Sequence, residues 1–284
     1  MWANILFHSL WIFPVYSFFG WCLEVVYCSV NTGEFVNRGF LNGAACPIYG
    51  FGAGFLIFCL TPVQDNLLLL YLGSVVIGSL LELIGGFLLK KIFHMTWWDY
   101  SSQPMNIGGY ICLKFSLAWG VAGVMLMNVI HPLIVDVILI IPGVLFNVLL
   151  TVFYSFFVLD IVITVTAVLK LNRDLREITR LSELIHMSSD RMAESIGNTA
   201  LFAADKMKEL ELTEKTIEIS ERIQTSIKDN RDRLKVLLNN GSIVRSRLLK
   251  AFPRMNNAHH SRALNDMKER FKNRVKKRRE SKNK

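Results

Sequence analysis

Two glutamates within long apolar stretches are the residues whose type and spacing suggest chemistry. Glu24 and Glu82 lie in segments 10–30 and 67–89, and each follows a glycine by four positions. A carboxylate in the bilayer costs about 3 kcal/mol or more unless it faces a bundle interior or a water-filled cavity. Such a pair could bind a cation, relay a proton or contact a polar substrate. The same side chains could instead hold the fold by accepting hydrogen bonds from loop backbone or from Arg38.

Small residues share the helical faces of both glutamates. Positions four residues apart lie on one side of a helix, and small residues there let helices approach closely. We therefore expect both carboxylates to face the inside of a bundle. The residues of these faces are Tyr16, Gly20 and Cys28 beside Glu24, and Ser74, Gly78 and Gly86 beside Glu82.

The glutamates belong to a longer pattern that occurs twice in the same order. Each copy has Gly-x-x-x-Glu in one apolar segment, then Asn-x-Gly with an aromatic residue after it, then an aromatic-Gly pair in the next apolar segment. The pattern predicts a parallel internal repeat, with halves at about 10–60 and 67–129 and a pseudo-twofold axis along the membrane normal. The first copy has its three motifs at Gly20, Asn37 and Tyr49, and the second at Gly78, Asn106 and Trp119.

Two connecting segments supply the other candidate residues. Residues 37–50 are too apolar for an ordinary exposed loop and could re-enter the membrane where protein satisfies their backbone. Residues 97–106 are dense in aromatic and hydrogen-bonding groups. Arg38 could pair with Glu24, Glu82 or Asp99, or bind an anionic head group, and acidic and hydroxyl residues of the second segment could equally cap helices. The predicted substrate or ion pathway comprises Glu24, Glu82, Asn37, Arg38, Asp99, Tyr100, Ser101, Asn106 and Tyr110.

The elements that position these residues are expected to be membrane helices. The chain of 284 residues is 52% hydrophobic with a mean hydropathy of +0.35, more apolar than a soluble domain of this length. Because a transmembrane helix needs about 20 apolar residues, we expect an all-α polytopic bundle of about five spans. They are 10–30, 44–60, 67–89, 107–129 and one within 134–169 with a break at Pro142-Gly143; outer connections follow at 61–66 and 128–133.

Positive charges predict the orientation. Connections 31–43 and 90–106 carry Arg38 and Lys90-Lys91, whereas 61–66 and 128–133 hold no lysine or arginine. Basic connections favour the cytoplasmic side. We therefore expect a multi-pass protein of the cell membrane, with its N-terminus outside and its C-terminus in the cytoplasm.

Charge also divides the chain into a transmembrane domain, 1–169, and a basic tail, 170–284. The first part holds four basic and seven acidic residues, a net charge of −3, so with +9 overall the tail carries +12. Helix-forming residues with apolar positions at intervals of three and four predict a helical cytoplasmic tail. Its basic end, 270–284, favours contact with anionic lipid or solvent, and no nucleic-acid partner is expected.

Several motifs together resemble a family of bacterial membrane proteins known as putative ABC-transporter type IV, or putative ABC transporter permease. The resemblance covers about residues 10–170, and 248–253 is also similar. It implies a permease-like membrane subunit, although Ala44-Ala45-Cys46 stands where Gly-Pro is commoner before Pro47. The motifs are Gly20-Trp-x-x-Glu24, Asn37-Arg-Gly-Phe-Leu41, Pro47-Ile-Tyr-Gly-x-Gly-Ala53, Trp97-Trp-Asp-Tyr-Ser101 and Asn106-Ile-x-Gly-Tyr-Ile-Cys-Leu-x-Phe-Ser-x-x-Trp-Gly120.

The leading hypothesis is a permease-like or transport-associated protein of unknown substrate, with its site at the cytoplasmic end of spans one to four. The chain has no G-x-x-x-x-G-K-[ST] phosphate loop, so in an ABC system a separate ATPase subunit would be needed. One alternative is a membrane enzyme acting on a lipid-linked substrate, with Glu24 and Glu82 as acid and base. Against it, the chain lacks H-E-x-x-H, a nucleophile elbow and zinc-type cysteine spacing, and we expect no cofactor. A second alternative is a scaffold that binds a partner through its tail helices.

Overall fold

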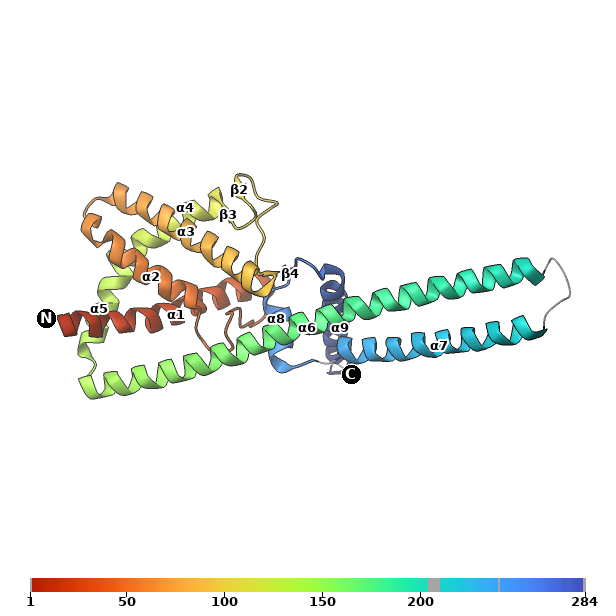
Figure 1. Cartoon of the computed structure of the whole chain (residues 1–284). Helices are drawn as coiled ribbons and strands as arrows, with labels where there is room; N and C mark the ends of the chain where they lie inside the picture. Colours follow the sequence, from red (N-terminus) through yellow and green to blue (C-terminus); the bar gives the residue numbers. More distant parts are fainter. Residues whose placement is uncertain (1, 204–209, 240, 283–284) are drawn as a thin grey trace. The chain divides into compact units, whose positions relative to one another are not determined.

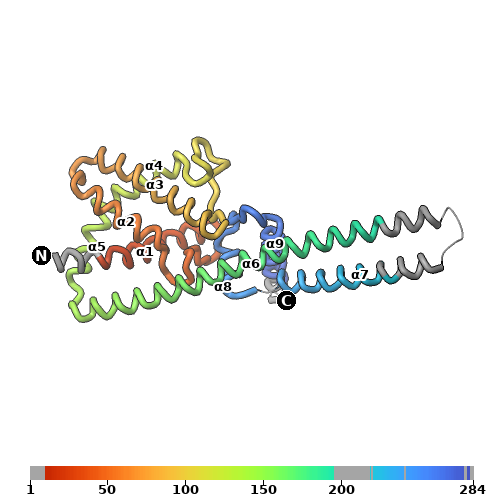
Figure 2. Tube along the Cα trace, viewed as in Figure 1, coloured from red at the N-terminus to blue at the C-terminus, as the bar shows by residue number. Residues whose placement is uncertain are grey.

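The structure is a computed structural model that describes residues 2–203, 210–239 and 241–282 (Figure 1; Figure 2). It is mostly helical, and its contacts divide the chain into two compact units. The first unit contains Met1–Leu169 and Ile243–Ala258, and the second contains Lys170–Ser242 and His259–Lys284. The segment Ile243–Ala258, which the sequence assigns to the tail, is therefore part of the first unit.

Four helical runs of the described chain are long and apolar enough to cross a membrane. They are Leu10–Thr32 within α1 (Trp2–Thr32), Leu67–Phe93 (α3), Leu113–Ile140, and Gly143–Glu194 within α6 (Gly143–Ala203). The shortest has 23 residues, which at 1.5 Å per residue spans roughly 35 Å. The protein is therefore a multi-pass membrane protein.

The expected second span is shorter than the others. α2 (Pro47–Leu60) has 14 residues and continues into a single 3-10 turn, η1 (Thr61–Val63). Its length of about 21 Å falls below the roughly 30 Å of a bilayer's hydrocarbon core. The residues before it, from Gly33 to Cys46, form a loop instead of helix.

Two expected boundaries are wrong. The predicted outer connection 128–133 is helical: α4 (Leu113–Met125) passes through a π-helical stretch, η2 (Leu126–Ile130), into α5 (His131–Ile140). Pro132 cannot donate a backbone hydrogen bond, and a wider π turn before it accommodates that loss without breaking the helix. The break occurs at Ile141 and Pro142, just before α6, as the sequence predicted.

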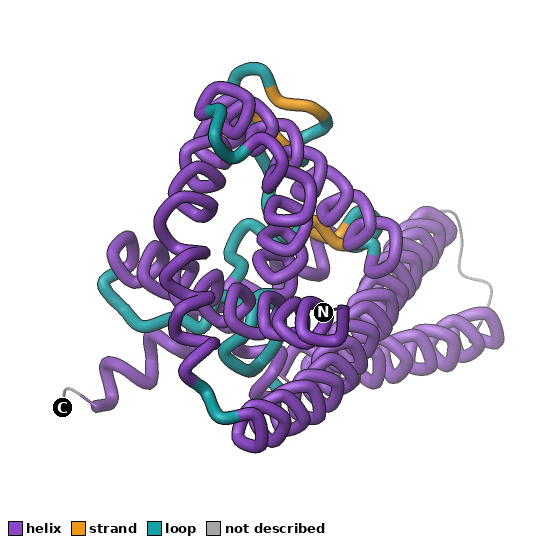
Figure 3. Tube along the Cα trace, turned by 90° about the vertical axis from the view of Figure 1, so that its left-hand side faces the viewer, coloured by secondary structure: helices purple, strands orange, loops and turns teal. Residues whose placement is uncertain are grey.

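The predicted fourth span also begins later than residue 107. Residues before α4 form a small hairpin of β2 (Asn106–Ile107) and β3 (Ile111–Cys112). Three residues, Gly108 to Tyr110, join the two strands, and Gly108 and Gly109 have φ of +58° and +74°, the left-handed conformation that glycine adopts without steric cost. Figure 3 shows how small this strand content is beside the helices.

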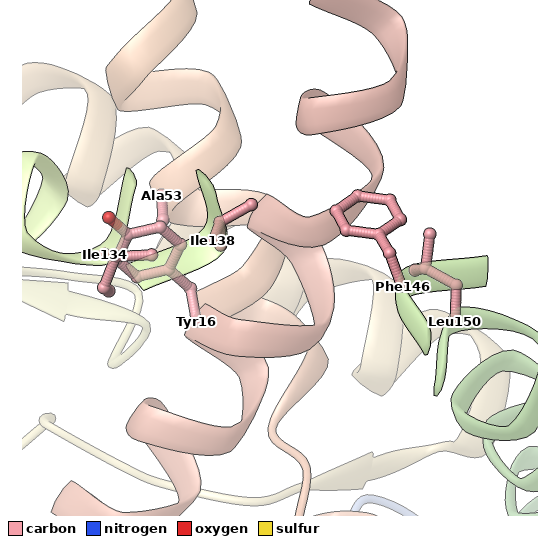
Figure 4. Close-up of a cluster of buried hydrophobic side chains, with 6 residues drawn as sticks. All are labelled: Tyr16, Ala53, Ile134, Ile138, Phe146 and Leu150. Carbon is pink, nitrogen blue, oxygen red and sulfur yellow. The ribbon is translucent and has the colours of Figure 1, made fainter. Parts of the chain in front are cut away.

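The core of the first unit joins its first two helices to the α5–α6 turn. Tyr16 is 4% exposed and its hydroxyl lies 3.0 Å from Nδ1 of His131. Burial of such a cluster excludes lipid from between the helices, so it fixes how α1 and α6 pack. The buried members are Tyr16, Ala53, Ile134, Ile138, Phe146 and Leu150 (Figure 4).

A late segment of the chain packs at the end of the first unit where α1 and α3 terminate. α8 (Ile243–Ala251) buries Leu248, Leu249 and Ala251, and Ala251 packs with Cys28 and Val36. Beyond it, β4 (Asn256–Asn257) pairs antiparallel with β1 (Met95–Thr96). The two connections of the predicted repeat are therefore both contacted by residues 243–258.

The second unit consists of the distal part of α6, α7 (Leu210–Asn239) and α9 (Ser261–Lys282). Apolar α6 residues at intervals of three and four are buried there, which is the pattern that the sequence predicted for a packed helix. Arg274 of α9 donates to the backbone carbonyl of Asn239 at 3.0 Å. The buried apolar residues in this part of α6 are Leu171, Leu175, Ile178 and Leu181.

Candidate functional site

Glu24 is held by groups from α2 and from the loop before it. Its carboxylate accepts a hydrogen bond of 2.8 Å from the Tyr49 hydroxyl, and Nε of Arg38 lies 3.4 Å away as an ion pair. Gly20, one turn earlier, lies against the Tyr49 ring, where any Cβ would clash. The close approach of α1 and α2 therefore brings Tyr49 to Glu24, and Arg38 neutralises the charge.

Glu82 is more deeply buried and has no such cation. Its side chain is 7% exposed, with one oxygen accepting from the Tyr100 hydroxyl at 3.0 Å and the other from Nε1 of Trp119 at 3.1 Å. Gly78 packs on Trp119, since a Cβ there would lie 2.7 Å from the tryptophan Cβ. Within the described part of the chain, Glu82 forms no ion pair.

The aromatic donors of the two carboxylates lie next to each other. The ring centroids of Tyr49 and Trp119 are 5.8 Å apart, and their planes are tilted by 58°. A centroid distance in this range is typical of a favourable aromatic pair. Glu24 and Glu82 therefore flank one aromatic pair, and each accepts a hydrogen bond from its nearer ring system.

The first connection is organised by Asn37. The side-chain oxygen of Asn37 accepts from Nε1 of Trp21 at 2.8 Å and from the backbone N–H of Gly39 at 3.2 Å, while its amide donates to the carbonyl of Asn42 at 2.7 Å. These bonds satisfy backbone groups that no helix or strand pairs. Asn37 thus shapes the loop that presents Arg38.

Asp160 of α6 binds the same loop. One carboxylate oxygen accepts from the backbone N–H and the side-chain amide of Asn42, at 3.0 and 2.9 Å, and the other accepts from the N–H of Gly43 at 2.6 Å. Charged acceptors make stronger hydrogen bonds than neutral ones. Asp160 lies in a predicted apolar span, and its isolation there was the one sequence signal that could have identified it.

Arg247 of α8 completes this arrangement. Its guanidinium donates to the carbonyls of Gly39 at 2.6 Å and Phe40 at 2.8 Å, and to Oδ1 of Asn42 at 3.1 Å. Burial lowers the pKa of this guanidinium, and the nearby Asp160 carboxylate opposes that shift. A single side chain thus caps three acceptors of the loop, and no local pattern in the sequence pointed to it.

The second connection mostly satisfies its own backbone. Asp99 accepts from the N–H of Ser101 at 2.8 Å, and Asn106 donates to the carbonyl of Ser101 at 3.2 Å while accepting from the N–H of Gly109. Tyr110 accepts through its carbonyl from Nε1 of Trp98 at 2.9 Å. Of the candidates in this connection, Tyr100 is the one whose side chain reaches a glutamate, and Arg38 pairs with Glu24 rather than with Asp99.

A cavity of about 500 Å³ lies among α1, α2, α3 and α4. Glu82, Tyr49 and Trp119 contribute to its wall, whereas Glu24 does not. Its other walls are apolar side chains and helix backbone at glycines, and its volume is in the range of small-molecule sites. Within the residues that the structure describes, no group of three His, Cys, Asp or Glu side chains could hold a metal ion.

A bundle of long apolar helices, with carboxylates held inside it by neighbouring helices, defines a multi-pass integral membrane protein. Residues 11–165 match the family described as Putative ABC-transporter type IV, which is more than half of the chain, so the protein belongs to this family. The resemblance in the sequence is thereby confirmed. The match ends before α8, so Arg247 lies outside it. No curated protein and no solved structure matches the chain.

Proposed function

We propose that this family member is a permease-like, transport-associated membrane subunit in which Glu82 is the ligand-facing carboxylate. The observation that carries the proposal is the combination of cavity and charge. Glu82 lines the cavity, its oxygens are held by two neutral donors, and among described residues it lacks an ion pair. The negative charge of a buried carboxylate that has only neutral hydrogen-bond donors is neutralised only when a proton or a cation binds.

Glu24 is assigned a supporting role by the same reasoning. Its charge is already matched by Arg38, and it holds Tyr49 against α1. Asn37 supports Arg38 through the loop, and Tyr100 supports Glu82. We assign Asp99, Ser101, Asn106 and Tyr110 to shaping the second connection. The side chains of Asp99 and Asn106 bind backbone groups, and Ser101 and Tyr110 take part in these hydrogen bonds through their own backbone.

The proposal includes the parallel repeat. The same three-part contact supports it in both halves: a glycine packs on an aromatic ring, and that ring's polar atom binds the glutamate one turn further along. Gly50 lies against Phe13 and Ser17, and Gly120 lies against Tyr71 and Val75. If Gly20 corresponds to Gly78, then Phe13 and Ser17 correspond to Tyr71 and Val75. If Tyr49 corresponds to Trp119, then Gly50 corresponds to Gly120, so the two sets of contacts match.

We also propose that α2 crosses the membrane, giving five crossings with the N-terminus outside. Helices α1, α2, α3, α4 and the first part of α6 run in alternating directions, which supports this topology (Figure 1). Pro47–Val63 covers 17 residues, or about 25 Å, and local thinning can accommodate such a short span. Reporter fusions at Glu34, in the loop before α2, and at Asp65, just after it, should therefore report opposite sides of the membrane. If both report the same side, α2 does not cross.

A separate ATP-hydrolysing subunit is part of the proposal, because the chain carries no phosphate loop of its own. Family membership supports such a partner. Purification of the full chain from native membranes, followed by mass spectrometry, should recover an ATPase in stoichiometric amount. Recovery of a lipid-modifying enzyme in its place would favour the alternative of a lipid-linked substrate.

The role of Glu82 predicts opposite effects of two matched substitutions on stability. Glu82→Gln removes an unbalanced buried charge, while its amide oxygen can accept from Trp119 and its NH₂ can donate to the Tyr100 oxygen. We expect this change to stabilise the fold by roughly 1 kcal/mol. Glu24→Gln leaves Arg38 without its partner, which should cost about 1 kcal/mol or less for a partly exposed pair.

Thermal denaturation of the full chain in detergent measures both effects. The midpoint should rise for Glu82→Gln and fall slightly for Glu24→Gln. If the midpoint of Glu82→Gln falls as much as that of a helix-packing mutant, Glu82 holds the fold, and the proposed ligand-facing role is wrong.

A further inference from the structure

We infer that the cavity among α1 to α4 binds a single-chain amphiphile with an ammonium head, which enters sideways from the bilayer. The inference rests on the proposed role of Glu82 and names the chemical class of its ligand. It is carried by three properties of the cavity: the character of its walls, the sign of its charge and the position of its rim.

The walls require an apolar body. Apart from Glu82, Tyr49, Trp119 and Tyr16, whose hydroxyl is already bonded to His131, the cavity is lined by apolar side chains, by Cys22 and by glycine backbone. A sugar or a hydrated ion would lose hydrogen bonds to water there without replacement, which costs several kcal/mol. An alkyl chain would instead fill the space favourably. The apolar wall residues include Phe19, Leu23, Leu56, Leu81, Met125 and Leu126.

The charge requires a cationic head. No lysine or arginine is among the described residues that line the cavity, and Glu82 is its one acidic residue. Each carboxylate oxygen of Glu82 has accepted one hydrogen bond, which leaves capacity for a further donor. The rings of Tyr49 and Trp119 offer faces that attract a cation. A fatty acid would meet Glu82 with a like charge, and a phospholipid would bring its phosphate into the same place.

The rim lies on the lipid-facing surface. Leu23 and Val26 of α1 line the cavity and are 63% and 60% exposed, and Met125 at the end of α4 lines it and is 53% exposed. Residues that both line a cavity and reach the surface form its opening. Because these residues are apolar and belong to candidate spans, the opening faces acyl chains, where an amphiphile already resides.

The test uses the full chain in nanodiscs of zwitterionic lipid and two matched probes. A brominated dodecylammonium quenches tryptophan emission on contact, and brominated dodecanoate has the same chain with the opposite charge. We expect saturable quenching by the ammonium probe at least tenfold tighter than by the carboxylate probe, because a desolvated charge discriminates strongly against its opposite. Equal, non-saturable quenching by both probes is the signature of bilayer partitioning alone and would overturn the inference.

Two glycines of α2 provide a matched pair of variants. Gly52 lines the cavity, and a Cβ there would have Leu81 as its nearest neighbour at 3.8 Å, so Gly52→Leu should fill the cavity and abolish saturable quenching. Gly54 does not line it and has similar room, with Ile12 at 4.0 Å. Gly54→Leu should therefore leave quenching unchanged. If both or neither of the variants abolish quenching, the probe does not bind in the cavity.

Glu82→Gln separates this inference from the proposed function. We expect this substitution to weaken binding of the ammonium probe at least tenfold, while binding of a neutral brominated dodecylamide should be unaffected. If quenching responds to Gly52→Leu but not to Glu82→Gln, the cavity binds ligands and the ligand-facing role of Glu82 is wrong. If no probe binds saturably while Glu82→Gln still stabilises the fold, the ammonium amphiphile is wrong and the role of Glu82 stands.

Discussion

Replacing Asp160 with alanine is expected to release the loop between α1 and α2 from its anchor on α6. The substitution removes the acceptor of three hydrogen bonds from the loop, two of them from the backbone N–H groups of Asn42 and Gly43. Each hydrogen bond to a charged group contributes about 1.5–3 kcal/mol, with incomplete additivity. We therefore expect a local loss of about 3 kcal/mol, which corresponds to roughly a hundredfold increase in opening.

Hydrogen exchange of the full chain measures this loss directly. Peptides covering residues 37–46 should exchange about a hundredfold faster in Asp160→Ala, and to a smaller degree in Asp160→Asn, which keeps one acceptor oxygen. Asp136→Ala provides the control, because Asp136 is an exposed acid on α5. Unchanged exchange at residues 42 and 43 in Asp160→Ala would show that these bonds do not hold the loop.

Arg247→Ala is expected to destabilise the same loop by about 2–3 kcal/mol. Gly39, Phe40 and Asn42 each lose a donor, and the planar guanidinium fork cannot be replaced by a single ammonium. Arg247→Lys should therefore restore only part of the stability. The nearby Lys250 is the control, because its ion pair with Glu34 is partly exposed and is worth about 1 kcal/mol or less.

Cysteine modification gives a readout at the end of the loop. Cys46 is 5% exposed, and its backbone N–H donates to the carbonyl of Ser17 at 2.8 Å. Maleimide labelling of Cys46 in the full chain should accelerate by roughly thirtyfold or more in Arg247→Ala and change little in Lys250→Ala. Equal rates in the two variants would contradict the assignment of Arg247 as the clamp.

The sequence predicted those parts of the fold that depend on local hydrophobic length. Long apolar runs identified the four long helices, and Pro142 identified the break before α6. The predicted connection 128–133 was wrong, because a π turn lets the helix continue past His131 and Pro132. The hairpin of β2 and β3 was missed because two-residue strands have no detectable period.

The candidate site could be predicted where its partners repeat in the sequence. The matched Gly-x-x-x-Glu and aromatic-Gly motifs identified both glutamates and the positions of Tyr49 and Trp119, although not the hydrogen bonds between them. The contacts of Asp160 and Arg247 with Asn42 could not be predicted, because these residues lie 118 and 205 positions away from it. Contacts between residues so far apart in the chain produce no periodic pattern or short motif in the sequence.

The separation of Asn42 from Arg247 in the sequence also determines how long the loop must wait for this partner during synthesis. Chains are synthesised at about 5–20 residues per second, so the 205 residues between these partners take roughly 10–40 s to make. During that interval the loop can be held by Asp160, which emerges earlier, but its carbonyls at Gly39 and Phe40 await a donor. Membrane insertion can thus be finished while the loop is still incomplete. A chain truncated before α8 would carry the same unfinished loop permanently, offering quality-control proteases an accessible segment.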